Sequence, residues 1–284
     1  MTKLELIYED NHVLVAVKPP NLPAQADQSG DADMLSHCRE YIRVTRKKPG
    51  QTYIGLVHRL DRPAAGLMVF ALTSKAAGRL CEQMREHQAG RSYLAIVHGV
   101  PKSGVLVHYL KESTGKMRSV PENTPGAKRA ELNLEVVETF DSPNEGKLTL
   151  CVVQLKTGRK HQIRAQLAAQ GHALFGDARY DFGRAKPGQQ LALWGYKLVF
   201  RHPTLQRDMT FFSRPKGQSW TAFEEAIERV VGPVVEKESG GVSERKTFPT
   251  SERESGAAIE EKLTPVVETE PAPAIEREES PKAD

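Results

Sequence analysis

Cysteine is scarce in this chain of 284 residues, and long apolar runs are missing. The three cysteines, Cys38, Cys81 and Cys151, form no C-x-x-C pair, which argues against a disulfide framework. Cys81 and Cys151 lie in apolar periodic segments, so we expect both to be small core residues. No stretch approaches the roughly 18 apolar residues of a membrane span, and the acidic first ten residues do not resemble a secretory signal. The expected setting is therefore reducing and cytoplasmic.

Several catalytic signatures are missing as well. The chain has no Gly-x-x-x-x-Gly-Lys-Ser/Thr phosphate loop and no Gly-x-Gly-x-x-Gly after a strand, which argues against two common nucleotide-binding folds. No cysteine or histidine pair has the spacing of zinc ligands, and no Gly-x-Ser-x-Gly predicts a hydrolase nucleophile. The 9 histidines are scattered, so we expect most of them to be structural or exposed.

Charge is distributed unevenly along the chain. The whole sequence carries +4, but residues 232–284 hold 13 Asp and Glu against 7 Lys and Arg, which leaves +10 on residues 1–231. A basic body is typical of proteins that bind nucleic acid, although an ordinary basic surface explains the charge equally well. The segment 232–284 is rich in Glu, Pro, Ser and Thr, and its apolar residues are isolated. We therefore predict one folded domain, residues 1–231, followed by a disordered tail, residues 232–284.

The hydrophobic pattern predicts short strands in neighbouring pairs, with helices between them. Strands are expected near residues 4–8, 12–18, 53–57, 67–72, 92–97, 105–110, 131–137, 147–155, 190–200 and 209–212. Helices are expected at 34–45 after a capping Asp33, at 74–88 after a capping Ser74, at 160–170, and from Ser219 to 231. Residues 111–129 are polar and rich in Gly, Pro and Lys, which predicts a loop or insertion. Together these elements favour an α+β fold with a mixed, largely antiparallel sheet flanked by helices.

The first segment with unusual chemistry runs from Val57 to Gly66. It places one carboxylate, Asp61, among two arginines and a histidine, between two apolar strands. Buried charges need partners, and an aspartate beside arginines remains ionised at neutral pH and can serve as a nucleophile or base. Gly66 allows the backbone to turn sharply into the next strand. A surface turn with a salt bridge explains the same residues.

The second segment runs from Thr157 to Arg164 and connects a strand to a helix. A turn that contains glycine and leads into a helix presents backbone N–H groups that suit an anion. Arg159, Lys160 and Arg164 add cationic side chains to this turn. Phosphate binding and a basic helix face in solvent are both compatible with this pattern, and Arg159 and Lys160 are the candidate phosphate contacts.

Both segments resemble the RluA-type family of RNA pseudouridine synthases. His58-Arg59-Leu60-Asp61 with Gly66 is similar to the family's His-Arg-Leu-Asp turn. Residues 157–164, followed by Gly171, Gly176-Asp177 and Tyr180, resemble its Thr-Gly-Arg-x-His-Gln-Ile-Arg block. Further matches follow the family's order from about residue 4 to 215: a Lys-Pro loop at 17–23, a strand carrying Tyr93, and a late strand at 191–203.

The chain also departs from the family pattern in places. Arg62-Pro63-Ala64-Ala65 replaces a common Thr-Ser-Gly turn after Asp61, and Pro63 should stiffen this turn. Arg91 stands where a lysine is common, which keeps the charge, and Gln166 and Trp194 each replace a frequent histidine. None of these changes touches Asp61 itself.

The resemblance implies that residues 1–231 form a pseudouridine synthase-like catalytic domain with a central RNA-binding cleft. Asp61 would attack the ribose C1′ or promote elimination there, and both routes remain open. Arg164 would pair with Asp61 and keep it ionised, and Tyr93 would lie against the base and help remove its C5 proton. Arg59 would fill the space that a flipped uridine leaves. The isomerisation requires no metal and no organic cofactor, and we expect a monomer that acts on structured ribosomal or transfer RNA.

Two other functions remain alternatives at this point. A non-catalytic RNA-binding protein, for example a ribosome-assembly factor, would not require Asp61, Tyr93 and Arg164 together. An enzyme that acts on carbohydrates would need a second carboxylate near Asp61, and we see none in a fitting context. RNA choice depends on shape and loop contacts, which leaves ribosomal and transfer RNA as alternative substrates.

Overall fold

The computed structural model describes residues 4–47 and 52–232. The predicted tail, residues 232–284, lies outside these residues apart from Gly232. The described residues form a sheet of 11 strands together with four α-helices and a 3-10 helix. No helix among them is long and apolar enough to span a membrane.

The predicted α+β fold with a mixed, largely antiparallel sheet is confirmed. The strands are β1 Glu5–Glu9, β2 Val13–Lys18, β3 Gly55–Leu56, β4 Ala65–Ala71, β5 Gly90–His98, β6 Gly104–Ser113, β7 Lys116–Val120, β8 Lys128–Ser142, β9 Gly146–Leu155, β10 Leu193–Arg201 and β11 Asp208–Phe212. The helices are α1 Met34–Thr45, α2 Ser74–Arg85, α3 Gln162–Ala169 and α4 Glu224–Val231, and the 3-10 helix Gln218–Phe223 precedes α4. In space the strands run β1-β2-β4-β10-β5-β9-β8-β6-β7, with β3 paired to β4 and β11 paired to β10. Of these pairings only β4 with β10 is parallel.

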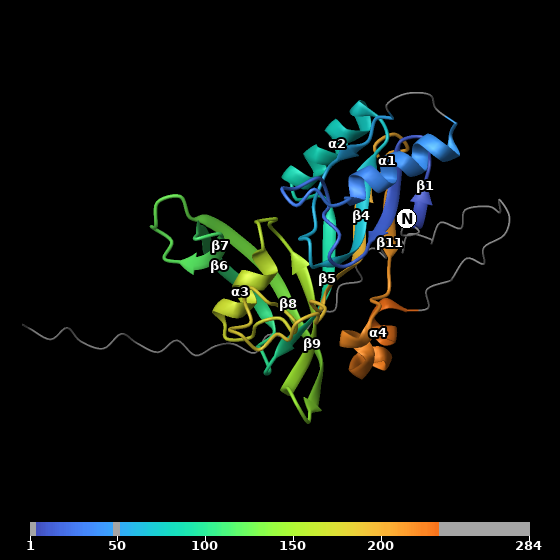
Figure 1. The fold of residues 1–284 in the computed structure, drawn as a ribbon. Helices are drawn as coiled ribbons and strands as arrows, with labels where there is room; N and C mark the ends of the chain where they lie inside the picture. Colours follow the sequence, from blue (N-terminus) through green and yellow to red (C-terminus); the bar gives the residue numbers. More distant parts are fainter. Residues whose placement is uncertain (1–3, 48–51, 233–284) are drawn as a thin grey trace, which may run out of the picture. The chain divides into compact units, whose positions relative to one another are not determined.

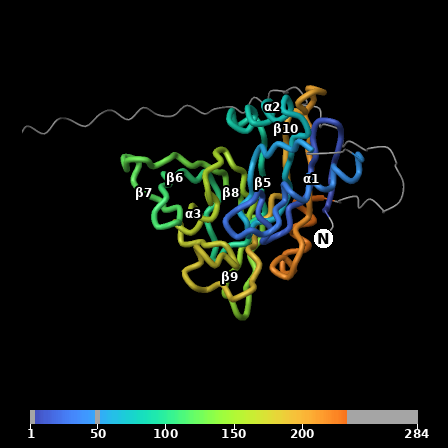
Figure 2. The backbone as a smooth tube through the Cα atoms, turned by 45° about the horizontal axis from the view of Figure 1, so that its top comes forward, coloured from blue at the N-terminus to red at the C-terminus, as the bar shows by residue number. Residues whose placement is uncertain are grey.

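Helices cover both faces of the sheet (Figure 1). Alternate residues of a strand point to opposite faces, so Val13, Val15 and Val17 of β2 join a core with α2 and α4. Leu14 and Ala16 of the same strand join a second core with α1 and α3. In the turned view of Figure 2, α3 again lies beside β8, whereas α1 and α2 lie with the N-terminal strands. Leu60, Tyr93 and Ile163 belong to this second core. The motifs that contain them therefore lie on the face of the sheet that α1 and α3 cover.

Helix α1 begins and ends as the sequence predicts. The carboxylate of Asp33 accepts the backbone N–H of Ser36 at 3.0 Å, which satisfies one of the free donors at the start of the helix. Met34, Cys38 and Ile42 recur at helical spacing, and all three are buried.

Helix α2 differs from the prediction at both ends. Thr73 caps it instead of Ser74, because the Thr73 hydroxyl accepts the backbone N–H of Ala76 at 3.2 Å. The helix ends at Arg85 rather than near residue 88, and His87, with a φ of 57°, turns the chain toward β5. The prediction that Cys81 is a core residue is wrong: Cys81 is exposed.

The helix that was expected from Ser219 begins differently. Ser219 lies inside the 3-10 helix, and its hydroxyl donates to the carbonyl of Gln190 at 3.1 Å instead of capping α4. Helix α4 starts at Glu224 and has no side-chain cap.

The prediction of a loop or insertion at 111–129 is correct only in part, because residues 114–115 and 121–127 lie between strands and the others belong to β6, β7 and β8. Strand β6 continues to Ser113, β7 follows at Lys116, and β8 begins at Lys128. Thr114 and Gly115 join β6 to β7 with φ values of 48° and 72°, and two consecutive positive φ values are typical of a tight hairpin turn. A threonine in this position is unusual, and the hairpin strands are mostly exposed. The sequence therefore carries only one of the two usual turn residues, Gly115, and these mostly exposed strands lack a clear apolar alternation.

Gly66 makes the parallel pairing of β4 with β10 possible. It pairs with Gly195, and a Cβ at Gly66 would lie 2.3 Å from the backbone nitrogen of Gly195, at a φ of +122°. Both the contact and the φ exclude a side chain. Gly66→Ala is expected to prevent folding or to lower the free energy of unfolding by more than about 4 kcal/mol, a loss typical of disrupted backbone packing. Soluble yield and urea denaturation measure this effect.

Gly78 provides the matched control for this substitution. It lies inside α2, and a Cβ there would meet no atom within 4 Å. Gly78→Ala is expected to raise the free energy of unfolding by roughly 0.5–1 kcal/mol, because alanine favours a helix more than glycine does. Equal effects of the two substitutions would refute the special role of Gly66.

Candidate active site

Asp61 lies in the turn between β3 and β4, with its side chain 24% exposed. Its Oδ2 accepts a hydrogen bond from Nη1 of Arg164 at 3.2 Å. Nε2 of His161 lies 4.0 Å from the same oxygen. The carboxylate is thus accessible to a ligand and held next to fixed cationic or polar groups.

Arg164 is buried, with a side chain only 5% exposed. Its planar fork is directed at Asp177, because Nε and Nη2 each donate to that carboxylate at 2.7 Å. The third contact is the one to Asp61, and the guanidinium carbon lies 5.1 Å from the ring centre of Tyr180. A bidentate pair of this kind fixes an arginine in one orientation. Asp177 therefore orients Arg164, and Nη1 remains for Asp61.

The turn before α3 is held by the side chain of Gln162. Its Oε1 accepts the Thr157 hydroxyl at 2.8 Å and the backbone N–H of Arg159 at 2.9 Å. Its amide nitrogen donates to the carbonyl of Glu131 in β8 at 3.0 Å. These contacts connect the turn to the sheet and define where α3 begins.

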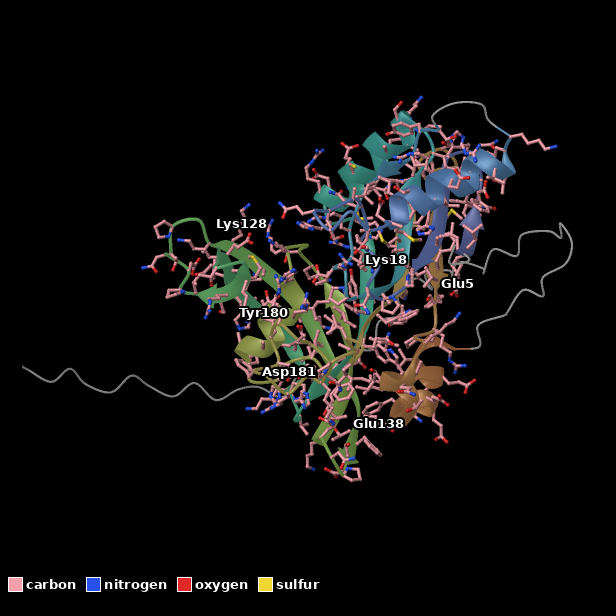
Figure 3. All side chains as sticks on the ribbon, in the orientation of Figure 1. Glu5, Lys18, Lys128, Glu138, Tyr180 and Asp181 are labelled. Carbon is pink, nitrogen blue, oxygen red and sulfur yellow. The ribbon has the colours of Figure 1, made fainter. Side chains whose placement is uncertain are left out.

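His161 and Tyr180 continue this arrangement toward Asp61. His161 has a φ of 49°, and its Nδ1 lies 2.9 Å from the hydroxyl of Tyr180. The Tyr180 hydroxyl also accepts the backbone N–H of Met117 at 2.9 Å. Figure 3 labels Tyr180 beside α3. The left-handed backbone at His161 thereby directs an imidazole toward the carboxylate.

The predicted phosphate contacts have partners within the chain. Nε of Arg159 donates to the carbonyl of Arg129 at 3.0 Å, and Nζ of Lys160 pairs with Glu112 at 2.5 Å. Both side chains are exposed, so RNA could compete for them. Arg59 is also exposed and lies two residues before Asp61.

Tyr93 and Lys18 lie in one row of neighbouring residues across the sheet. Lys18 pairs with Gly66, Gly66 with Gly195, and Gly195 with Tyr93. A Cβ at Gly195 would lie 3.5 Å from the Tyr93 ring. Burial raises the pKa of the Tyr93 hydroxyl, the nearby charge of Arg91 opposes this shift, and the charge of Asp61 adds to it. Gly66 and Gly195 thus separate the phenol of Tyr93 from the ammonium group of Lys18 in this row, and neither has a side chain to fill the space between them.

Lys18 is fully buried, and Figure 3 labels it in the N-terminal part of the chain. Its Nζ donates to the carbonyls of Pro19, Leu22 and Arg62 at 2.9, 2.7 and 3.0 Å. Three acceptors match the three donors of an ammonium group. Burial lowers the pKa of Lys18 to about 7, and the nearby charge of Asp61 opposes this shift. Lys18 therefore connects the Lys-Pro loop to the turn that carries Asp61.

Lys18→Met is expected to lower the free energy of unfolding by about 2–4 kcal/mol, because it removes the shared donor of three inner carbonyls. Urea denaturation at neutral pH measures the change. The matched control is Lys75→Met in α2, where the lysine is exposed and a change below about 0.5 kcal/mol is expected. Equal stability of Lys18→Met and the wild type would show that these carbonyls do not depend on Lys18.

Sequence reasoning did not assign roles to four residues around Asp61: Lys18, His161, Asp177 and Tyr180. All four lie inside the motifs that resemble the family, so their positions carried a signal. Their roles depend on contacts between segments far apart in the chain, such as the one between Lys18 and Arg62.

Comparison with known proteins gives consistent results. Residues 12–169 match the sequence profile described as RNA pseudouridylate synthase. The chain is 31% identical over 227 residues to ribosomal large subunit pseudouridine synthase D of Neisseria meningitidis. This alignment covers 73% of this chain and 57% of that protein. It is 35% identical over 183 residues to the protein of the same name in Pseudomonas aeruginosa, covering 63% of this chain and 53% of that protein. The chain therefore spans a little over half the length of these two relatives.

Two further similarities extend the comparison. tRNA pseudouridine synthase C of Vibrio parahaemolyticus is 28% identical over 222 residues, which cover 73% of this chain and 88% of that protein. Among solved structures, human RNA pseudouridylate synthase domain containing 4 superposes with a TM-score of 0.62 at 21% identity, over 80% of this chain and 92% of that one. This superposition supports the fold.

Proposed function

Because this chain belongs to the RNA pseudouridylate synthase family, we propose that it isomerises uridine in RNA to pseudouridine, with Asp61 as the nucleophile. The observation that carries the proposal is the partly exposed carboxylate of Asp61, held by a buried arginine. A protein that only binds RNA needs cationic surface, but it does not need an oriented carboxylate beside a buried phenol. Ribosomal and transfer RNA are both compatible with the names of the relatives.

The proposed reaction breaks one bond to C1′ and forms another. The Asp61 carboxylate attacks C1′ of the ribose, or promotes elimination there, and the N1–C1′ bond breaks with the electron pair going to uracil. The uracil rotates, and its C5 forms the new bond to C1′. The C5 proton is then lost, and N1 gains a proton, so the reaction is redox-neutral. It requires no metal or organic cofactor.

The side chains around Asp61 fit separate tasks in this reaction. Arg164 stabilises the carboxylate as an ion when it is expelled again. Tyr93 lies buried beside Gly195 and supports the uracil ring as it rotates, and its hydroxyl is the group we assign to the C5 proton. Uracil must leave the RNA stack to reach this site, and the exposed Arg59 would fill the vacated space.

The proposal is tested by mapping pseudouridines in strains with and without the gene. One or more sites are expected to disappear on deletion and to return with the wild-type gene. Purified protein should form pseudouridine in RNA from the deletion strain without added cofactor. RNA binding without product would instead support the non-catalytic alternative.

We also propose that residues 1–231 carry the activity as a monomer and that the acidic segment 232–284 is dispensable. A chain ending at Gly232 is expected to fold and to keep kcat within about threefold, because the described core and every residue discussed above precede it. Losing a net charge of −6 should leave RNA affinity unchanged or slightly higher. Gel filtration and single-turnover kinetics check both statements, and a tenfold lower kcat would place part of the active domain in the tail.

A further inference from the structure

Within the described part of the chain, Arg91 at the start of β5 has no partner that explains its position. It is half-buried, and its Nε is buried without a hydrogen-bond partner in that part of the chain. Among residues 4–47 and 52–232, no carboxylate lies within ion-pair distance of Arg91. A cation removed from water without a counter-ion is unfavourable. Buried polar groups of this kind indicate a missing ligand or ordered water.

The surroundings of Arg91 place it at the candidate active site. It lies two residues before Tyr93, on the same face of β5. Burial raises the pKa of Tyr93, the charge of Arg91 lowers it, and the charge of Asp61 raises it. Burial, followed by the nearby charge of Arg91, lowers the pKa of His58 to about 3. Any anion bound by Arg91 would therefore lie next to the reacting nucleotide.

Gly158 leaves the space in which the guanidinium of Arg91 lies. A Cβ at Gly158 would be 2.9 Å from Nη1 and 3.0 Å from Nη2 of Arg91. Gly158 does not have a positive φ, so its backbone does not require glycine. The absence of a side chain instead allows the guanidinium to lie directly against the Thr157–Arg159 turn.

A second donor without a partner lies nearby. Nε2 of His58 accepts the backbone N–H of Val69 at 3.0 Å, which places the imidazole proton on Nδ1. This Nδ1 is buried and has no hydrogen-bond partner among the described residues. His58 and Arg91 thus both carry donors that no described residue uses, whereas Arg159 and Lys160 have partners within the chain.

On this basis we propose that Arg91, placed by Gly158, binds a backbone phosphate of the RNA directly beside the reacting uridine. The planar guanidinium matches two oxygens of a phosphate. Phosphate is also the anion that an RNA substrate supplies at every nucleotide. This inference rests on the proposed function, since it requires RNA at this site.

The test changes the RNA as well as the protein. A synthetic RNA hairpin spanning the mapped uridine is made with normal phosphates, and again with one neutral methylphosphonate on the 5′ or the 3′ side of that uridine. The nucleotide that precedes the substitution is 2′-O-methylated in all versions. Wild-type affinity is expected to fall about tenfold or more at one of the two positions, the loss of a charged hydrogen-bonded pair.

Arg91→Ala is expected to lose a similar factor on normal RNA and to respond less than twofold to the same methylphosphonate. Its slope of log affinity against log salt should fall by about 0.7, the value for one single-strand phosphate. Gly158→Ala should reproduce part of the loss by displacing the guanidinium. Arg85→Ala is the control, because Arg85 is exposed on α2 at the other face of the sheet.

Two outcomes would overturn the proposal. In the first, the methylphosphonate and Arg91→Ala each lower RNA affinity and their effects multiply, so the two changes act independently. In the second, a methylphosphonate at neither position changes the affinity of the wild type. If Arg91→Ala does not fold, the methylphosphonate RNA with the wild type and with Gly158→Ala still tests the proposal. Pseudouridine formation by the wild type is measured first, on a hairpin with normal phosphates and no 2′-O-methyl group. If the wild type forms no pseudouridine, the proposed function is refuted. If it forms pseudouridine but the effects of the methylphosphonate and Arg91→Ala on affinity are independent, only the role of Arg91 is refuted.

Discussion

Asp61→Asn is expected to lower the single-turnover rate of pseudouridine formation by about 10⁴-fold or more, a loss typical of removing a nucleophile. Asparagine keeps the size and much of the hydrogen bonding of aspartate, but it removes the charge and the attacking oxygen. Saturating enzyme and quantification of pseudouridine separate chemistry from binding. RNA affinity should change less than about threefold, because phosphate contacts elsewhere provide most of the binding free energy.

Asp61→Glu provides the geometric control for this prediction. It keeps the carboxylate but moves it by roughly an ångström, enough to impair a step that depends on precise distances. We expect a loss of about 10²-fold or more. Formation of pseudouridine by Asp61→Asn at a rate near that of the wild type would refute both the mechanism and the assignment of Asp61.

Arg164→Lys is expected to lower kcat by about 10²-fold or more, even though the positive charge is kept. Lysine cannot donate to both oxygens of Asp177 and at the same time present a fixed N–H to Asp61. The rate should fall because the carboxylate loses its oriented partner, an effect of the size seen when one preorganised donor is removed. RNA affinity should remain within about threefold, since Arg164 is buried.

Two comparisons make this second prediction specific. Asp177→Asn leaves Arg164 in place but weakens the group that orients it, so we expect a smaller loss in kcat with little change in KM. Arg184→Lys, at an exposed arginine, should change neither quantity. Activity of Arg164→Lys near the wild-type level would show that the contact between Arg164 and Asp61 is not required for chemistry.

Sequence reasoning identified the elements that are defined locally. Asp33 and the apolar spacing of α1 were sufficient to place that helix, because capping and periodicity act within a few residues. Asp61 and Arg164 were singled out through motifs, and the structure brings them into contact across 103 positions of the chain. The fork between Arg164 and Asp177 was not predicted, although the two residues are only 13 positions apart. It depends on how the turn after α3 folds back, which neither residue type indicates.

The remaining differences have similar physical causes. The β6–β7 hairpin is mostly exposed, so its strands lack the apolar alternation that identifies a half-buried strand. The contact between Gly66 and Gly195 joins two distant segments in parallel, and glycine alone predicts only conformational freedom. Helical periodicity did not predict the burial of Cys81 correctly. Leu80, the residue before it, is fully buried, whereas Cys81 is exposed.

The position of β10 between β4 and β5 has a consequence for synthesis on the ribosome. Strands β4 and β5 are made early, but they are separated in the sheet by a strand that begins at Leu193. Until that segment leaves the exit tunnel, the two strands have unpaired edges, and the row from Lys18 to Tyr93 is incomplete. A nascent chain therefore has no assembled site for most of its translation. Folding of this sheet centre awaits a late segment, which predicts slow, high-contact-order folding and a period in which the growing chain is exposed to aggregation.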